Sequence, residues 1–159
     1  MEERGGLSRE IVIFDTNIYV HHYLGYQPLI DLFDQLIDNG KEIHMPSIIV
    51  MELMWYHEVE TNENIKAAKQ GYIEAADEII DITKDIALKA AEIRRKWNID
   101  TGKKLKQGDA LIAASAITNN ATLYSNNDKD FKYIEKHFNL KYINPINAKN
   151  LEVFKKSIT

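Results

Sequence analysis

The chain has 159 residues, a net charge of −4, 45% hydrophobic and 28% charged residues, and no cysteine. This length suits one domain with a single core, and the missing cysteines exclude disulfides and thiolate metal sites while favouring a reducing compartment. No apolar run approaches the ~20 residues that cross a bilayer, and the polar N-terminus lacks the apolar centre of a signal peptide. We therefore expect a cytoplasmic protein with no membrane contact, a flexible tail at residues 1–9 and one domain at residues 10–159.

Short apolar runs alternate with helical patterns along the chain. In chain order, the predicted elements are a strand at 11–14, a helix at 28–39, a strand at 42–45, a helix starting at 46–47, an exposed helix at 58–76, a strand at 78–83, a helix at 86–97, a polar loop at 98–108, an apolar helix from 109, a strand at 121–125, a helix at 131–138 and a strand at 139–145. Strands that alternate with helices in this way predict an α/β domain with a mainly parallel central sheet flanked by helices.

Acidic residues fall at the ends of several predicted elements. Asp15 ends the first strand, Asp109 opens the apolar helix, and Asp128 and Asp130 follow the fourth strand. Glu52 lies within "SIIVMELMW", where a buried carboxylate costs several kcal/mol unless a partner compensates it. Ligands of parallel α/β sheets bind at the carboxyl ends of strands, so we expect these acids to converge.

Each acid also has a purely structural interpretation. Asp15 suits a turn, Glu52 could point to solvent, Asp109 could serve the helix dipole, and Asp128 and Asp130 could cap the following helix. Taken together they favour a hard divalent cation such as Mg²⁺ or Mn²⁺, which takes oxygen ligands and relieves the repulsion between carboxylates. No histidine stands at a metal-ligand spacing from these acids, which argues against zinc and against a serine–histidine mechanism.

A basic run precedes the apolar helix. Residues 84–106 hold eight basic and three acidic side chains, an excess of five positive charges in a chain that is acidic overall. The run fits either a solvated helix face or a patch for phosphates. The residues proposed to contact RNA are Arg94, Arg95, Lys103, Lys104 and Lys106.

The order and spacing of five segments resemble the PIN-domain nucleases, and among them the VapC-type toxins of toxin–antitoxin pairs. The segments are "IVIFDTNIYV" (11–20), "MPSIIVMEL" (45–53), "IIDITKDIALKAAEIR" (79–94), "KLKQGDALIAASAI" (104–117) and "ATLYSNNDKDF" (121–131). The resemblance implies a PIN-like three-layer α/β sandwich. It also implies a Mg²⁺- or Mn²⁺-dependent endoribonuclease, an antitoxin partner and a homodimer.

The same resemblance assigns roles to individual residues. Asp15, Glu52 and Asp109 match the first three acidic ligands, and Thr16, Asn17 and Ser125 match the polar residues that support them. The fourth acid depends on the alignment of "SNNDKDF": one register selects Asn127 and Asp130, and a shift of one selects Asp128. We favour Asp130 and keep Asp128 as the alternative.

The resulting hypothesis is that a metal-activated water hydrolyses an RNA phosphodiester. Asp15 and Asp109 would hold the principal ion, with Glu52 and Asp130 completing the pocket and one of these two orienting the water. A catalytically silent PIN-like module that binds RNA or protein is the main alternative. A phosphatase with Asp15 as its nucleophile is a weaker one, because Thr16-Asn17 supplies neither a second aspartate nor a lysine.

Exposed aromatic and apolar residues are the last candidates for contacts with partners. Base stacking is considered for Tyr19, Tyr23, Trp55 and Tyr56, with core or dimer packing favoured for Trp55. Leu24, Tyr26 and Leu29 form either a self-complementary dimer patch or part of the core.

Overall fold

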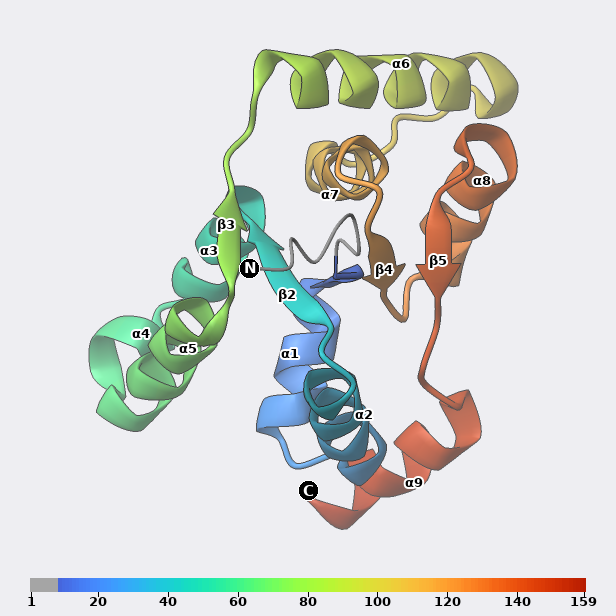
Figure 1. The fold of residues 1–159 in the computed structure, drawn as a ribbon. Helices are drawn as coiled ribbons and strands as arrows, with labels where there is room; N and C mark the ends of the chain where they lie inside the picture. The colour runs from blue at the N-terminus through green and yellow to red at the C-terminus, as the bar shows by residue number, and fades with distance from the viewer. Residues whose placement is uncertain (1–8) are drawn as a thin grey trace, which may run out of the picture.

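Five short strands form one parallel sheet at the centre of the computed structural model, which describes residues 9–159 (Figure 1). The strands are β1 (Ile11–Phe14), β2 (Glu42–Pro46), β3 (Glu78–Ile80), β4 (Thr122–Tyr124) and β5 (Lys141–Ile143). Their spatial order is β3-β2-β1-β4-β5. From β1 the chain adds β2 and β3 on one side of the sheet and then β4 and β5 on the other side of β1. The strand order therefore reverses between β1 and β4.

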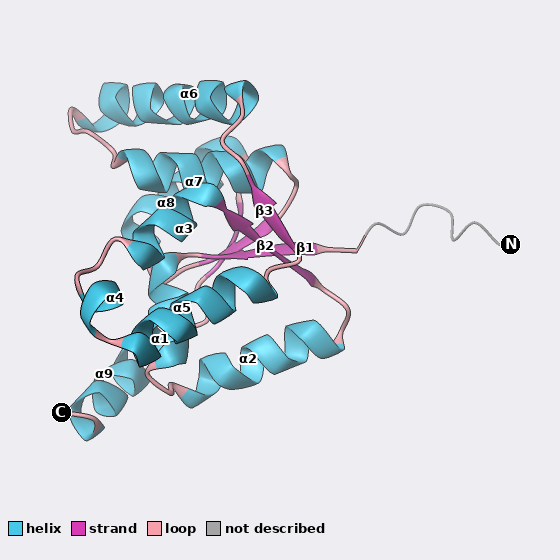
Figure 2. Cartoon of the chain, turned by 90° about the vertical axis from the view of Figure 1, so that its left-hand side faces the viewer, coloured by secondary structure: helices cyan, strands magenta, loops and turns pink. Residues whose placement is uncertain are grey.

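Helices cover both faces of this sheet. They are α1 (Thr16–Tyr23), α2 (Gln27–Asp38), α3 (Ser47–Met54), α4 (Glu58–Thr61), α5 (Glu63–Ala75), α6 (Lys84–Thr101), α7 (Gln107–Thr118), α8 (Asp128–Phe138) and α9 (Ala148–Ser157). In Figure 2, α6 and α7 lie on one side of the sheet, with α6 outermost, and α1 and α2 lie on the other. The predicted α/β sandwich is confirmed.

The apolar pattern explains the central elements. The β1 residues Val12, Ile13 and Phe14 are buried, as expected for a middle strand covered on both faces. Helix α7 is buried over most of its length because its alanines, with Ile112 and Ser115, let it pack closely against the sheet and α6. No helix within residues 9–159 has the length and apolar character needed to cross a membrane.

Several predicted boundaries differ from the structure. The expected helix at 58–76 is two helices, α4 and α5, because Asn62 breaks the run and accepts hydrogen bonds from the backbone N–H groups of Asn64 and Ile65. The expected strand at 78–83 ends at Ile80, and the polar loop at 98–108 is shorter, since α6 continues to Thr101 and α7 begins at Gln107. Helices α1 and α9 were not predicted. The expected tail at 1–9 lies outside the described residues except for Arg9.

The structure decides several of the roles suggested for exposed aromatic and apolar residues. Tyr19 is only 2% exposed and packs edge-on against Phe14, so it cannot stack on a base. Of the two alternatives given for Leu24, Tyr26 and Leu29, the core is confirmed for Tyr26 and Leu29, while Leu24 is exposed. Trp55 is 67% exposed, so the core packing suggested for it does not occur.

Candidate active site

Asp15 stands where β1 ends, beside β4, at the point where the sheet changes its direction of growth. Its backbone N–H donates to the carbonyl of Tyr124 at 2.9 Å, which continues the pairing of the two strands. Its side chain caps α1 by accepting from the N–H of Thr16 at 2.8 Å. The turn interpretation is thus partly right locally, but the 5% exposed carboxylate lies at the position where parallel sheets bind ligands.

Two polar side chains hold the second oxygen of Asp15. Ser125, directly after β4, donates its hydroxyl to Oδ2 at 2.7 Å, and Asn17 donates its amide at 3.3 Å. Asn17 also accepts from the backbone N–H of Asn126 at 3.2 Å. The ends of β1 and β4 are therefore tied together around one buried carboxylate.

Glu52 reaches the same place from α3. The Thr16 hydroxyl donates to its Oε2 at 2.6 Å, and its other oxygen lies against the first turn of α7. A Cβ atom added at Gly108 would stand only 2.9 Å from Glu52 Oε1, so glycine leaves the room that this carboxylate occupies. The idea that Glu52 points freely into solvent is therefore wrong.

Asp109 lies in the first turn of α7, where a negative charge is favoured by the helix dipole. Its carboxylate also faces other acids: Asn127 donates to its Oδ2 at 3.4 Å, and the same amide donates to Asp130 Oδ2 at 3.0 Å. One asparagine thus bridges the carboxylates of α7 and α8. The dipole alone does not account for this arrangement.

The two acids of α8 have different surroundings. Asp130 is 9% exposed and faces Asn127 and Asp109. Asp128 is half-buried and turns to the other side, where its Oδ1 accepts from Tyr142 at 2.6 Å and from Asn144 at 3.1 Å. The geometry therefore brings Asp130 together with Asp15, Glu52 and Asp109, and it leaves Asp128 outside this group.

The charges of the cluster influence one another. Burial raises the pKa of Asp15 to about 6, with the nearby charges of Glu52 and Asp130 acting in the same direction against hydrogen bonds from Ser125 and Thr16. Burial, a hydrogen bond shared with Asp130 and the charges of Asp15 and Asp130 raise the pKa of Asp109 to about 8, and Lys106 opposes them. The four carboxyl groups therefore share one electrostatic environment that favours a proton or a cation.

The ligand chemistry fits a hard divalent cation, because the charged groups of the cluster are all carboxylates, which offer oxygen ligands. Within residues 9–159, no three acidic or histidine side chains are close enough to form a complete ligand set. Magnesium commonly takes one or two carboxylates and keeps several waters, so such a set is not required. A cation would also relieve the repulsion that raises the pKa of Asp109.

The basic residues predicted to bind RNA fall into two groups. Arg95, Lys103, Lys104 and Lys106 are exposed on the end of α6 and the loop that leads to α7. Arg94 is half-buried and donates its Nε–H to the carbonyl of Leu105 at 3.0 Å. Arg94 thus fixes the loop, while the exposed members place positive charge on the approach to Asp109.

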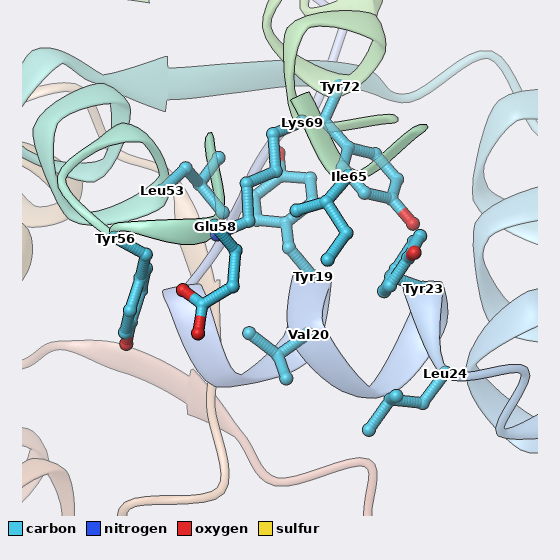
Figure 3. A pocket seen from close by; sticks show the side chains of 10 residues that line it. All are labelled: Tyr19, Val20, Tyr23, Leu24, Leu53, Tyr56, Glu58, Ile65, Lys69 and Tyr72. Carbon is cyan, nitrogen blue, oxygen red and sulfur yellow. The ribbon is translucent and has the colours of Figure 1, made fainter. Parts of the chain in front are cut away.

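Residues of α1, α3 and α5 line an apolar groove of about 360 Å³ (Figure 3). The groove and the acidic cluster both use α1 and α3: Thr16 and Glu52 belong to the cluster, and Val20 and Leu53 line the groove. The remaining lining residues are Tyr19, Tyr23, Leu24, Tyr56, Glu58, Ile65, Lys69 and Tyr72. Exposed apolar surface next to a polar site is typical of a place where another molecule binds.

Sequence reasoning missed the residues that support the cluster from behind. Gly108 was not singled out, although a glycine in the first turn of a helix is unfavourable and therefore informative. Tyr142 and Asn144 carry no local motif, since their importance depends on the pairing of β4 with β5. That pairing is long-range, and the sequence offers no direct signal for it.

These features define a class: a parallel α/β domain that collects carboxylates at the carboxyl edge of its sheet, where the strand order reverses. Comparison with known proteins assigns the chain to one family within this class. Residues 12–137 match the PIN domain, and the chain belongs to the PIN-domain family.

Relatives and solved structures agree with this membership. The chain is 29% identical over 119 residues to Ribonuclease VapC19 of Mycobacterium tuberculosis, covering 75% of this chain and 90% of that protein. It is 29% identical over 124 residues to Ribonuclease VapC2 of Rickettsia felis, covering 78% and 92%. VapBC2 from Rickettsia felis, solved with a DNA fragment of its promoter, matches with a TM-score of 0.70 and 28% identity over 84% of this chain and 98% of that chain. DNA-bound VapBC from Salmonella typhimurium matches with a TM-score of 0.72 at 19% identity, over 87% and 100%, which speaks for the fold.

Proposed function

We propose that this protein is a Mg²⁺- or Mn²⁺-dependent endoribonuclease that acts as the toxin of a toxin–antitoxin pair. The observation that carries the proposal is the shared environment of Asp15, Glu52, Asp109 and Asp130 at the reversal point of the sheet. Membership of the PIN family supports it, as do relatives named ribonucleases and structural neighbours solved as VapBC complexes. Acting on RNA would place the protein in the cytoplasm.

In this proposal Asp15 and Asp109 would hold the principal ion, and Glu52 and Asp130 would complete the pocket. When bound, a divalent ion lowers the pKa of a water and neutralises charge on the phosphate oxygens. The chain's own residues fix the carboxylates: Ser125 and Asn17 hold Asp15, and Asn127 holds the other two aspartates. Glu52 or Asp130 then orients the attacking water and accepts its proton.

The RNA backbone would approach along the exposed basic residues Arg95, Lys103, Lys104 and Lys106. Long cationic side chains bind phosphates largely through charge, so they need no fixed partner in the free protein. Tyr23 and Tyr56 are 45% and 40% exposed and could stack on an unpaired base. Both also line the apolar groove.

The antitoxin would occupy that groove with an apolar segment. A segment lying in the groove between α1 and α5 would pass beside Thr16 and Glu52, which belong to α1 and α3, and would so cover the acidic cluster. We expect Leu24→Glu to weaken binding of a candidate antitoxin at least tenfold, since a charge would be buried in the interface, while RNA cleavage stays unchanged. Leu88→Glu, on the exposed face of α6, is the matched control. Equal binding by both variants would place the antitoxin elsewhere.

The catalytic proposal is tested by incubating the purified protein with a mixed RNA pool, with Mn²⁺ and then with a chelator. We expect cleavage with the metal and none after chelation. Asp15→Asn and Asp109→Asn should each lower cleavage by about a thousandfold, because a neutral amide removes a carboxylate from the reacting centre, while circular dichroism stays unchanged. Undiminished cleavage by either variant would contradict the assignment. RNA binding without cleavage by the wild type would instead favour the silent module.

A further inference from the structure

A second layer of hydrogen bonds lies behind the loop that follows β4. Tyr142, on β5, places its hydroxyl 2.6 Å from Asp128 Oδ1 and 3.0 Å from the carbonyl of Ser125. Asn144 donates its amide to Asn126 Oδ1 at 3.2 Å and to Asp128 Oδ1 at 3.1 Å. Tyr142 and Asn144 therefore link the loop at 125–127 to Asp128 Oδ1 at the start of α8.

The front of the same loop holds the acidic cluster. Ser125 donates to Asp15, and Asn127 donates to Asp109 and Asp130. Between them, the backbone N–H of Asn126 donates to Asn17, which itself contacts Asp15. A small displacement of this loop would therefore change the contacts of three of the four carboxylates at once.

Asp128 is well suited to hold this loop in position. It begins α8, where negative charge is favoured, and two neutral donors converge on one of its oxygens while Lys132 stands 3.7 Å from the other. Both hydrogens of the Asn144 amide are used, and its Oδ1 accepts from the N–H of Ile146 at 3.0 Å. Each group in the layer is thus oriented by a partner outside the cluster.

We propose that Asp128, Tyr142 and Asn144 are positioning residues that act on the acids through residues 125–127 and do not touch the reacting atoms. This inference rests on the proposed nuclease function and gives Asp128 a role different from that of a fourth acid. What Asp128 supplies is a hydrogen-bond acceptor at one fixed point. Its negative charge at the reacting centre is not required.

The acceptor can be separated from the charge by comparing two substitutions. Asp128→Asn keeps an oxygen facing Tyr142 and Asn144, so RNA cleavage should stay within about threefold of the wild type. Asp128→Ala removes the acceptor and should lower kcat by about tenfold with little change in KM, as is usual when an outer partner of a site is removed. Tyr142→Phe should act like Asp128→Ala, and the double variant should be no worse than the single ones.

Two control variants show how large an effect to expect from the exposed ion pair of Asp128 and from loss of a member of the cluster. Lys132→Ala removes the exposed ion pair with Asp128 and should leave both kcat and KM unchanged. Asp130→Asn, at a member of the cluster, should abolish cleavage. If Asp128→Asn is as inactive as Asp130→Asn, Asp128 belongs to the reacting centre and the inference is wrong. If Asp128→Ala cleaves like the wild type, the loop needs no support and the inference is equally wrong.

Mn²⁺ binding measured by calorimetry without RNA provides a readout that does not depend on cleavage. Asp128→Ala should weaken binding by about tenfold, and Asp128→Asn should not. If the wild type cleaves no RNA, the proposed function fails, but the difference between these two variants still tests the positioning role. Equal Mn²⁺ affinity in Asp128→Ala and the wild type, at unchanged melting temperature, would overturn it.

Discussion

The acidic cluster and the basic run meet at the start of α7, and they are built in opposite ways. Asp15 and Asp130 are almost fully buried, and hydrogen bonds from several elements hold the cluster's carboxylates. The basic side chains of residues 95–106 are mostly exposed and lie on one helix end and one loop. Fixed, desolvated groups suit chemistry, which depends on fractions of an ångström. Exposed cations suit the capture of a polyanion, which depends mainly on charge.

This difference predicts that the contribution of the cluster to the free energy of unfolding changes with pH, whereas the contribution of the basic run does not. The raised pKa of Asp15, about 6, means that the folded protein holds this proton more tightly than the unfolded chain does. The stabilising effect of the proton is complete below about pH 4 and is lost as pH rises through 6. By linkage, a pKa raised by about two units corresponds to roughly 3 kcal/mol of unfolding free energy.

Asp15→Asn is the variant that isolates this effect. Its stability relative to the wild type should rise by up to roughly 3 kcal/mol between pH 4 and pH 8 in metal-free buffer. Using the difference matters because burial lowers the pKa of His21 and His22, which changes the stability of both proteins in the opposite direction. Urea unfolding at several pH values measures it. A constant difference across this range would mean that Asp15 is not held in a charge-repelling site.

Mn²⁺ should counteract the loss of stability that the wild type shows as pH rises. A cation binds the ionised carboxylates, so the stabilisation by Mn²⁺ should grow as pH rises towards and past 8, the region set by the raised pKa of Asp109. Melting temperatures with Mn²⁺ and with a chelator check this. Asp109→Asn should lose most of the increase.

Gly108 offers a smaller but sharper perturbation of the same cluster. In Gly108→Ala the new methyl group would stand 2.9 Å from Glu52 Oε1, and the flexible carboxylate would move away. Folding should be unharmed, because alanine favours a helix over glycine by up to about 1 kcal/mol. We expect cleavage to fall by about tenfold, since a misplaced group of this kind has such an effect even without a change in charge.

The matched control is Gly71→Ala in α5, where a Cβ atom would meet nothing within 4 Å. It should be at least as stable as the wild type and equally active. If both variants cleave RNA normally, Glu52 does not need the position that Gly108 leaves open.

The sequence predicted the central elements of the fold. It also predicted those parts of the site that follow from the pattern of neighbouring residues. The run ending at Asp15 and the helix carrying Asp109 both follow from the apolar pattern, and the resemblance named the acids that lie near one another in the structure. It could not decide between Asp128 and Asp130, because both suit the first turn of α8 equally well. The structure separates the two positions because Tyr142 on β5 and Asn144 just after it bind Asp128 on the side away from the cluster.

The sequence also did not show which aromatic residues are buried. Tyr19 lies in α1 and Trp55 directly follows α3, both with apolar neighbours in the sequence, yet Tyr19 is in the core and Trp55 is on the surface. Trp55 stands at the C-terminal end of α3 and is 67% exposed. Helical spacing predicts which residues share one face of a helix. Whether other elements cover that face depends on the packing of the whole fold.

The basic run should give the smallest effect and a different kind of effect. Arg95→Ala and Lys104→Ala remove exposed charges and should each raise the KM for RNA by about two- to threefold while kcat stays unchanged. Each should also reduce the dependence of binding on salt by about one phosphate contact. Arg94→Ala is the informative contrast, because it frees the Leu105 carbonyl and loosens the loop before α7. A loss of kcat in Arg94→Ala, with only KM changed in the other two, would show that this loop contributes positioning at its buried end and charge at its exposed one.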